Sequence, residues 1–234
     1  GLRYLCSLTN METHADLIAG LPLYKLEQIF EDVHVLARFG AGEIQLESLK
    51  VLPGTEMRKR AKEWGIRYSP YPPYEVLETN EITTEELQYA RQLSRLLDGY
   101  YNTPVWQKIT RQMILSEPGF LKSFLNFLIA SDVIDKPLSI EKRGLLLYDF
   151  CKQVYPEHTI HVSVAWITAG LSLKKAPAER VMTKHQNPPS AWNILHGKYK
   201  DSLKLCRLPY KSGNYWFGFE PETQIHVPAF IAQN

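Results

Sequence analysis

The sequence places polar side chains at alternate positions of two predicted strands. Residues 13–19 and 43–52 each have the composition of a strand and are followed by turn-forming residues. Side chains alternate between the two faces of a strand, so Gln45 and Glu47 share one face of the second strand, and Asp16 marks one face of the first. Carboxylate and amide groups arranged in this way can hydrogen-bond and orient a small molecule. We therefore take Asp16, Gln45 and Glu47 as candidate substrate-facing residues.

The cysteines do not form a metal-binding pattern. Cys6, Cys151 and Cys206 are far apart in the chain, so their spacing gives neither a zinc knuckle nor an iron–sulfur motif. An odd and sparse set of cysteines is typical of a reducing compartment. Residues 1–10 lack the apolar run of a signal peptide, and we expect a cytoplasmic location. The sequence does not begin with methionine, and we expect that more chain precedes Gly1.

Other kinds of site are poorly supported. His158 and His161 could share a helix face, but no third metal ligand is near them in the sequence, and His14 and His34 are expected at the surface or in packing. The chain has 27 Lys and Arg against 25 Asp and Glu, which argues against nucleic acid or an anionic membrane as partner. The basic stretch at 174–185 is expected to be a solvated surface. No apolar run spans a bilayer, and no Ser-His-Asp set, P-loop or Rossmann glycine pattern is present.

The elements that position the candidate residues form a β-α-β unit. Gly20-Leu21-Pro22 ends the first predicted strand, and apolar residues then recur at helical spacing from Leu26 to Ala37. Gly40 and Gly42 end this helix, and Pro53-Gly54 ends the second strand. A strand, a helix and a strand in so short a segment predict parallel strands with a right-handed crossover. Two strands alone cannot make a buried parallel sheet, so this unit needs further strands.

The remainder of the chain is predicted to be mostly helical. A short helix capped by Thr55 should precede a proline-rich extended connector at 66–80. Thr83 and Glu86 form a capping box for the next helix. The expected helices lie at 83–101, 105–115, 119–133, 140–155, 161–173 and 190–196. A β-hairpin is expected near 215–231, with its last strand at a sheet edge because of Pro228.

Three segments together resemble a known family. DLIAGLP at 16–22, VLPGT at 51–55 and PPYEVL at 72–77 have the order and spacing seen in radical S-adenosylmethionine (SAM) enzymes. The first two resemble the late strands of the radical SAM barrel in its coproporphyrinogen oxidase-like and cobalamin-binding branches, which include relatives of the anaerobic magnesium-protoporphyrin ester cyclase. The third resembles a poorly characterised domain that follows that barrel. The likeness covers residues 13–102.

The resemblance implies roles for particular residues. Ile18 and Gly20 match positions beside the SAM adenosyl group, and Val51 and Leu52 match the end of the strand that flanks the adenine. Gly20 lies at a strand end, where the absence of a Cβ lets a ligand or backbone approach closely. Barrel active sites collect at such carboxyl ends.

The resemblance also implies cofactors that this chain cannot hold alone. Radical SAM enzymes bind a [4Fe–4S] cluster through CxxxCxxC, which is absent here. We expect the cluster motif, the first barrel strands and a cobalamin domain upstream of Gly1, so this chain alone should be inactive.

The fold class we predict is an α/β piece of a partial TIM-like barrel, followed by a mostly helical domain with a small C-terminal β-hairpin. Residues 1–65 would form the last part of the barrel, and residues 66–80 would be an extended connector to an accessory domain at 81–234. This domain would cap the barrel and select an unknown small-molecule substrate for anaerobic chemistry. The alternatives are a non-catalytic helical binding module and, less favoured, a SAM-dependent methyltransferase without iron.

Overall fold

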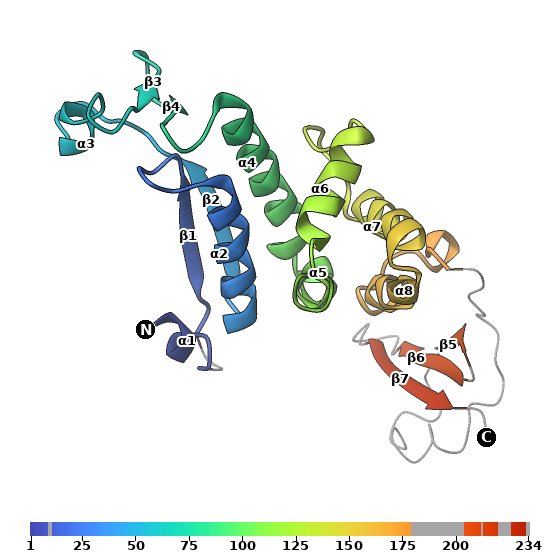
Figure 1. Cartoon of the computed structure of the whole chain (residues 1–234). Helices are drawn as coiled ribbons and strands as arrows, with labels where there is room; N and C mark the ends of the chain where they lie inside the picture. Colours follow the sequence, from blue (N-terminus) through green and yellow to red (C-terminus); the bar gives the residue numbers. More distant parts are fainter. Residues whose placement is uncertain (9–10, 179–203, 212, 220–225, 233–234) are drawn as a thin grey trace. The chain divides into compact units, whose positions relative to one another are not determined.

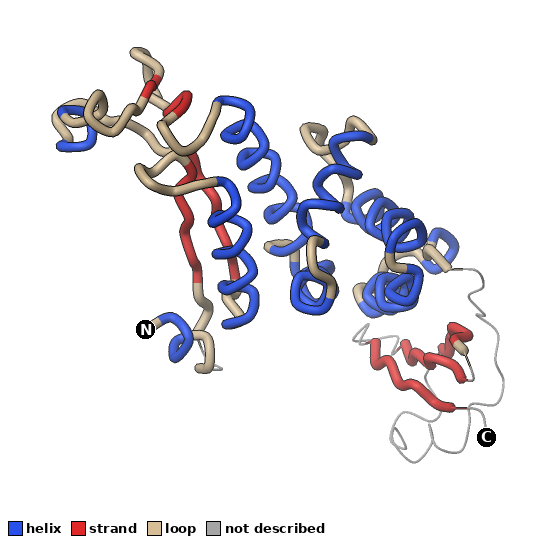
Figure 2. The backbone as a smooth tube through the Cα atoms, in the orientation of Figure 1, coloured by secondary structure: helices blue, strands red, loops and turns tan. Residues whose placement is uncertain are grey.

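The computed structural model describes residues 1–8, 11–178, 204–211, 213–219 and 226–232 (Figure 1). The chain divides into two compact units, Gly1–Pro137 and Leu138–Asn234. Helices predominate among the described elements, with small sheets in both units (Figure 2). The short helix predicted at 190–196 lies outside the described residues.

The first unit contains the predicted β-α-β segment. After a short helix α1 (Leu2–Leu5), the segment consists of β1 (His14–Ala19), α2 (Leu26–Phe39) and β2 (Glu43–Ser48). The two strands are parallel, and the register pairs His14 with Glu43 through to Ala19 with Ser48. The strand–helix–strand prediction is therefore confirmed, although the second strand ends at Ser48 and not at residue 52.

The sheet of β1 and β2 has two strands. Within the described residues no third strand joins it, so a partial barrel is not seen and stays a prediction. Beyond β2, α3 (Glu56–Lys59) begins at Thr55, whose hydroxyl accepts a hydrogen bond from the Arg58 backbone N–H as predicted. The predicted connector at 66–80 lies inside the first unit and contains an antiparallel pair, β3 (Arg67–Tyr68) and β4 (Val76–Glu78).

Four helical elements complete the first unit: α4 (Thr84–Leu96), the π-helical turn η1 (Leu97–Tyr101), α5 (Pro104–Ser116) and α6 (Phe120–Ala130). The predicted capping box is confirmed, because Thr83 and Glu86 each accept a hydrogen bond from the other's backbone N–H. Helix α4 packs against β2, while α2 packs against β1 and α5. The helices thus build their core directly against the β-α-β segment.

The second unit is a helical pair and an antiparallel sheet. Its elements are α7 (Ile140–Val154), the 3₁₀ turn η2 (Pro156–His158), α8 (Thr159–Thr168), the 3₁₀ turn η3 (Leu173–Lys175), β5 (Lys204–Tyr210), β6 (Gly213–Phe219) and β7 (His226–Ala232). The segment at 161–173, which alternates like a strand, is helical over its first part. The C-terminal β-hairpin is confirmed, but the sheet has a further strand, β5, that was not predicted. Pro228 lies in β7, an edge strand as expected.

Candidate functional site

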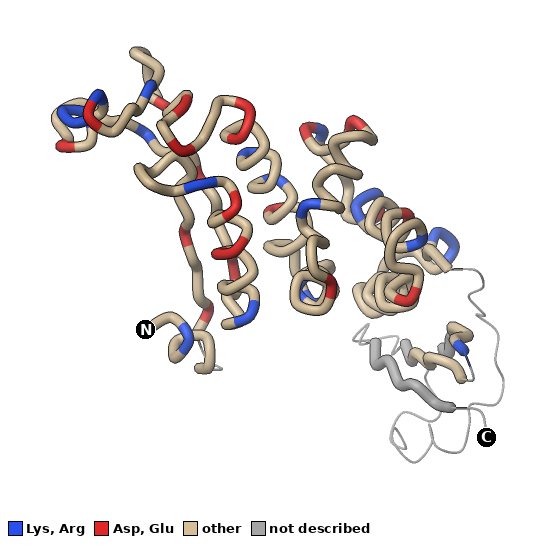
Figure 3. The backbone as a smooth tube through the Cα atoms, in the orientation of Figure 1, with Lys and Arg blue, Asp and Glu red and all other residues tan. Residues whose placement is uncertain are grey.

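One face of the β1–β2 sheet is covered and the other is open. Ala15 and Ala19 of β1 and Ile44 and Leu46 of β2 are buried towards the helices. The alternate residues point the other way, and most of them are exposed. We call this side the open face; its residues are His14, Asp16, Ile18, Glu43, Gln45 and Glu47. Acidic residues occur on both strands (Figure 3), and Asp16, Glu43 and Glu47 make half of the open face acidic.

The register brings the predicted substrate-facing residues together. Asp16 is paired directly with Gln45, and the neighbouring pair is Ile18 with Glu47. Directly opposed residues in a sheet have their Cβ atoms about 5 Å apart. Three side chains from segments nearly thirty residues apart therefore lie on one surface, which is where a bound molecule could contact all of them.

Two residues of the open face were missed as functional candidates. His14 Nδ1 lies 2.6 Å from Glu43 Oε2, and the side-chain amide of Gln45 donates a hydrogen bond to Glu43 Oε1 (2.9 Å). A carboxylate that holds one ring nitrogen of a histidine orients the ring and leaves the other nitrogen to bind or exchange a proton. The available signal was that His14 is two residues before Asp16 and so shares its face. The pairing with Glu43 depends on the strand register.

The four residues that the resemblance places near SAM differ in how exposed they are to solvent. Ile18 is 39% exposed and Leu52 is 48% exposed, whereas Val51 is completely buried. Gly20 has φ +90°, and a Cβ placed on it would lie 2.6 Å from Cγ1 of Val76 in β4. The close approach at Gly20 is thus made by a side chain of the same unit. Ile18 and Leu52 are the two of these four whose side chains could contact a ligand.

The thiols do not fit an iron–sulfur cluster. Cys6 is partly exposed in the first unit, and Cys151 is buried in the second. Burial, with a smaller effect of Glu157, raises the pKa of the Cys151 thiol to about 12, so it is a neutral side chain near pH 7. Cys206 lies in β5, and its side chain is outside the described part. No set of three thiolates is formed by the cysteines whose side chains are described.

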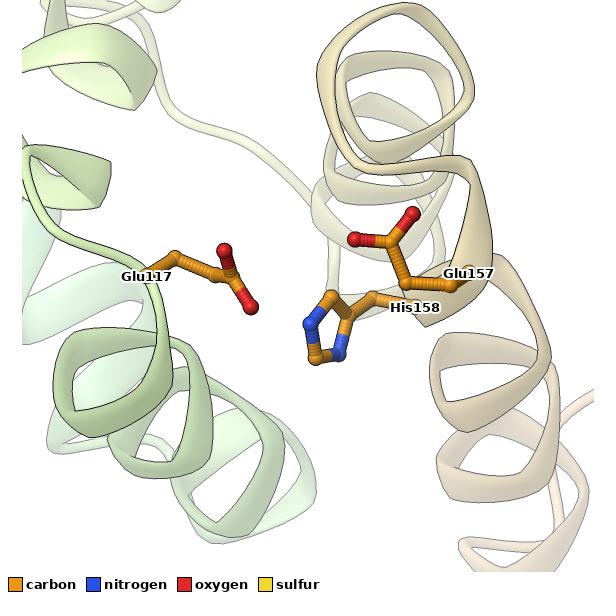
Figure 4. Close-up of side chains that lie close together, drawn as sticks. All are labelled: Glu117, Glu157 and His158. Atoms are coloured by element: carbon orange, nitrogen blue, oxygen red, sulfur yellow. The ribbon is translucent and has the colours of Figure 1, made fainter.

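His158 and His161 lie close together, but the described residues of the second unit do not complete a metal site around them. The rings of His158 and His161 are 5.7 Å apart between centroids, and His158 is buried. Burial, followed by the nearby His158 and Lys211, lowers the pKa of His161. Figure 4 shows His158 beside Glu157, together with Glu117, a residue of the first unit. Within the second unit, the described His, Cys, Asp and Glu side chains form no group of three ligands.

Comparison with known families gives one match. Residues 62–165, fewer than half of the chain, match a family described as "Protein of unknown function (DUF4080)". The matched segment begins after α3 and ends within α8. No curated protein compared with the chain matches it. None of the helices in the described part is long and apolar enough to cross a membrane.

Proposed function

We propose that this chain is the C-terminal part of a cobalamin-binding radical SAM enzyme. The observation that carries the proposal is the open face: a parallel β-α-β unit whose helix covers one side and whose other side is polar and uncovered. Parallel sheets are normally covered on both faces, as in barrels. The three sequence segments described above support the proposal, as does the DUF4080 match, because this domain is found in radical SAM and cobalamin-binding proteins.

In this proposal the open face lines the inside of the barrel. Asp16, Gln45 and Glu47 would hydrogen-bond the substrate, with Asp16 and Gln45 opposed in register. Ile18 is exposed near the end of β1 and Leu52 is exposed four residues after the end of β2, and both would pack against the adenosyl group of SAM. Val51 would act through packing, since it is buried. The His14–Glu43 pair lies at the opposite end of the strands, so we assign it no role in SAM binding.

The part of the chain that the structure describes offers no place for the cluster. The described thiols belong to two units, so the [4Fe–4S] cluster, SAM and cobalamin would be bound mainly by the preceding barrel strands and a cobalamin domain. Such a cluster, once reduced by an external electron donor, would supply the electron that cleaves SAM. This chain would supply substrate contacts in a cytoplasmic, anaerobic enzyme, and its helical part would cap the barrel and select the substrate.

The test uses the longer gene product. It is expressed anaerobically, reconstituted with iron and sulfide, reduced with dithionite, and assayed for cleavage of SAM to 5′-deoxyadenosine. We expect cleavage in the wild type and in Glu47→Gln, because Glu47 contacts the substrate and not the cluster. Glu63→Gln is the matched control, since Glu63 is an exposed residue paired with Arg60 away from the open face.

Two results would oppose the proposal. A cluster-loaded protein that never cleaves SAM would remove the enzyme assignment. A gene with no CxxxCxxC upstream of Gly1 would do the same. Either result would favour a non-catalytic helical binding module.

A further inference from the structure

The two outer edges of the β1–β2 sheet differ. The Glu43 N–H donates to Thr13 O (3.0 Å), and the Leu49 N–H donates to Ala19 O (2.9 Å). Successive residues of a strand direct their backbone groups to opposite sides, so the odd-numbered residues of β2 bond to β1. The even-numbered residues, beginning with Ile44, direct theirs to the outer edge of β2. The same alternation directs the backbone groups of Asp16 and Ile18 to the outer edge of β1.

The outer edge of β2 is closed at its start by a side chain. The Ile44 N–H donates to Asn102 Oδ1 (3.0 Å), and Asn102 Nδ2 donates to the Ile44 carbonyl (2.9 Å). A carboxamide offers the same donor and acceptor as a peptide group. Asn102 therefore satisfies both backbone groups of Ile44, as one residue of a neighbouring strand would.

Beyond the end of β2, the segment that leads into β4 pairs on the side of β1, because the odd-numbered Leu49 and Val51 direct their backbone groups there. The Val76 N–H donates to Leu49 O (2.9 Å), and the Val51 N–H donates to Tyr74 O (2.8 Å). Lys50 and Glu75 form an antiparallel bridge between these bonds. This pairing takes the place of β1 beyond Ala19, so at the outer edge of β2 it is Asn102 that an added parallel strand would have to displace.

A distorted helix presents Asn102 to the strand. The π-helical turn η1 ends at Tyr101, and π-turns inside helices often occur at functional positions. The Tyr101 hydroxyl donates to Ala41 O (2.7 Å), and Gln107 Nε2 donates to Gly42 O (2.6 Å). Asn102 Nδ2 also donates to Asp98 Oδ1 (3.1 Å), which fixes the orientation of the amide. Three backbone positions before and within β2, at Ala41, Gly42 and Ile44, are thus bound by side chains from η1 to α5.

We propose that Asn102 ends the sheet at β2, so that a further strand can be added only at the outer edge of β1. The closure at β2 stands on these contacts alone. The identity of the added strand rests on the proposed function: it is a parallel strand from the preceding part of the same longer protein. β2 is then the last strand, and Gln45 and Glu47 lie at the margin of the substrate surface, while Asp16 lies within it.

The closure is tested in the 234-residue chain by amide hydrogen exchange. In the wild type, the Ile44 amide and the Asn102 side-chain NH₂ protons should exchange slowly. In Asn102→Leu, exchange at Ile44 should accelerate by roughly fivefold to tenfold, the equivalent of one hydrogen bond, while Gln45 stays protected by β1. Asp98→Asn is the control, because an amide oxygen at position 98 still accepts from Asn102 Nδ2, so exchange at Ile44 should stay slow.

Unchanged exchange at Ile44 in a folded N102L variant would overturn the closure. If that variant does not fold, the exchange of the Asn102 side-chain protons in the wild type is the test. Exchange as fast as that of a free amide would overturn the closure of the β2 edge, and slow exchange would support it.

The open edge is tested by comparing the 234-residue chain with the longer gene product. The amides of Asp16 and Ile18 should be at least about tenfold more protected in the longer protein, which is typical of newly formed strand pairing. The amides of Leu46 and Ser48 should not change. Protection gained at Leu46 and Ser48, or none gained at Asp16 and Ile18, would overturn the assignment of the edge. SAM cleavage is measured separately, so an active enzyme without protection at Asp16 would reject the edge and leave the proposed function standing.

Discussion

His14 and Glu43 are the first residues of the two parallel strands, and their side chains meet on the open face with Nδ1 2.6 Å from Oε2. Their pairing reports the register of the whole sheet, since a shift of one residue would send every side chain to the other face. The same register opposes Asp16 to Gln45. The geometry of the candidate site therefore depends on the register, which the contact at its end reports.

A double-mutant cycle on His14→Asn and Glu43→Gln should give a small coupling. Both side chains are substantially exposed, and exposed ion pairs contribute about 0.2–1 kcal/mol to the free energy of unfolding. Chemical denaturation of the two single variants and the double variant measures this coupling. A value well above about 1 kcal/mol would mean that the pair is shielded from solvent in the 234-residue chain.

Gly20→Ala should destabilise the first unit strongly. The position has φ +90°, and the new Cβ would lie 2.6 Å from Val76 Cγ1. Left-handed strain costs about 1–2 kcal/mol and overpacking adds about 1–3 kcal/mol, so we expect a loss of about 2–5 kcal/mol in the free energy of unfolding.

The matched control for this prediction is Gly54→Ala. Gly54 also has positive φ (+83°), but nothing lies within 4 Å of its Cβ position. Its substitution should cost only the backbone strain, about 1–2 kcal/mol. Equal losses at the two positions in urea titrations would show that Val76 yields to the added methyl group.

Local signals in the sequence predicted much of the fold. The Thr83–Glu86 capping box and the apolar spacing of α2 are decided by residues close together in the chain, and both predictions were confirmed. The contact of Gly20 with Val76 and that of Asn102 with Ile44 join residues more than fifty positions apart. Such contacts depend on how elements pack, which periodicity does not encode.

The same distinction applies to the candidate site. Alternation along each strand correctly predicted that Gln45 and Glu47 share one face of β2 and that Asp16 lies on a defined face of β1. It could not show that these two faces belong to the same side of the sheet, because that depends on the register between the strands. The resemblance placed Val51 beside the adenine of SAM. In the structure Val51 is completely buried, and its N–H donates to Tyr74 O, a residue far along the chain.

Tyr101→Phe should destabilise the chain by about 1–2 kcal/mol near pH 8, because the buried hydroxyl donates to Ala41 O and its loss leaves that carbonyl unpaired. Burial raises the pKa of Tyr101 to about 12, from 10.0. Above pH 10 the unfolded state loses the phenolic proton while the folded state keeps it, so folding becomes less favourable as pH rises. Phenylalanine does not titrate. The advantage of the wild type over Tyr101→Phe should therefore shrink between pH 10 and 12 in denaturation curves, and a constant difference would contradict the burial of this hydroxyl.

Cys151 should be unreactive in the folded chain, and Cys6 should react. The thiolate is the reactive form, and burial raises the pKa of Cys151 to about 12, so almost none is ionised at pH 8. Cys6 is partly exposed, with its sulfur 3.5 Å from the Thr13 hydroxyl. In a Cys206→Ser background, a chromogenic disulfide reagent at pH 8 should label one thiol quickly and the second only after denaturant is added. The Cys6→Ser variant of that background identifies the fast site. Rapid labelling of Cys151 in it would show that the helical pair of the second unit opens readily, because a closed core admits no reagent to that sulfur.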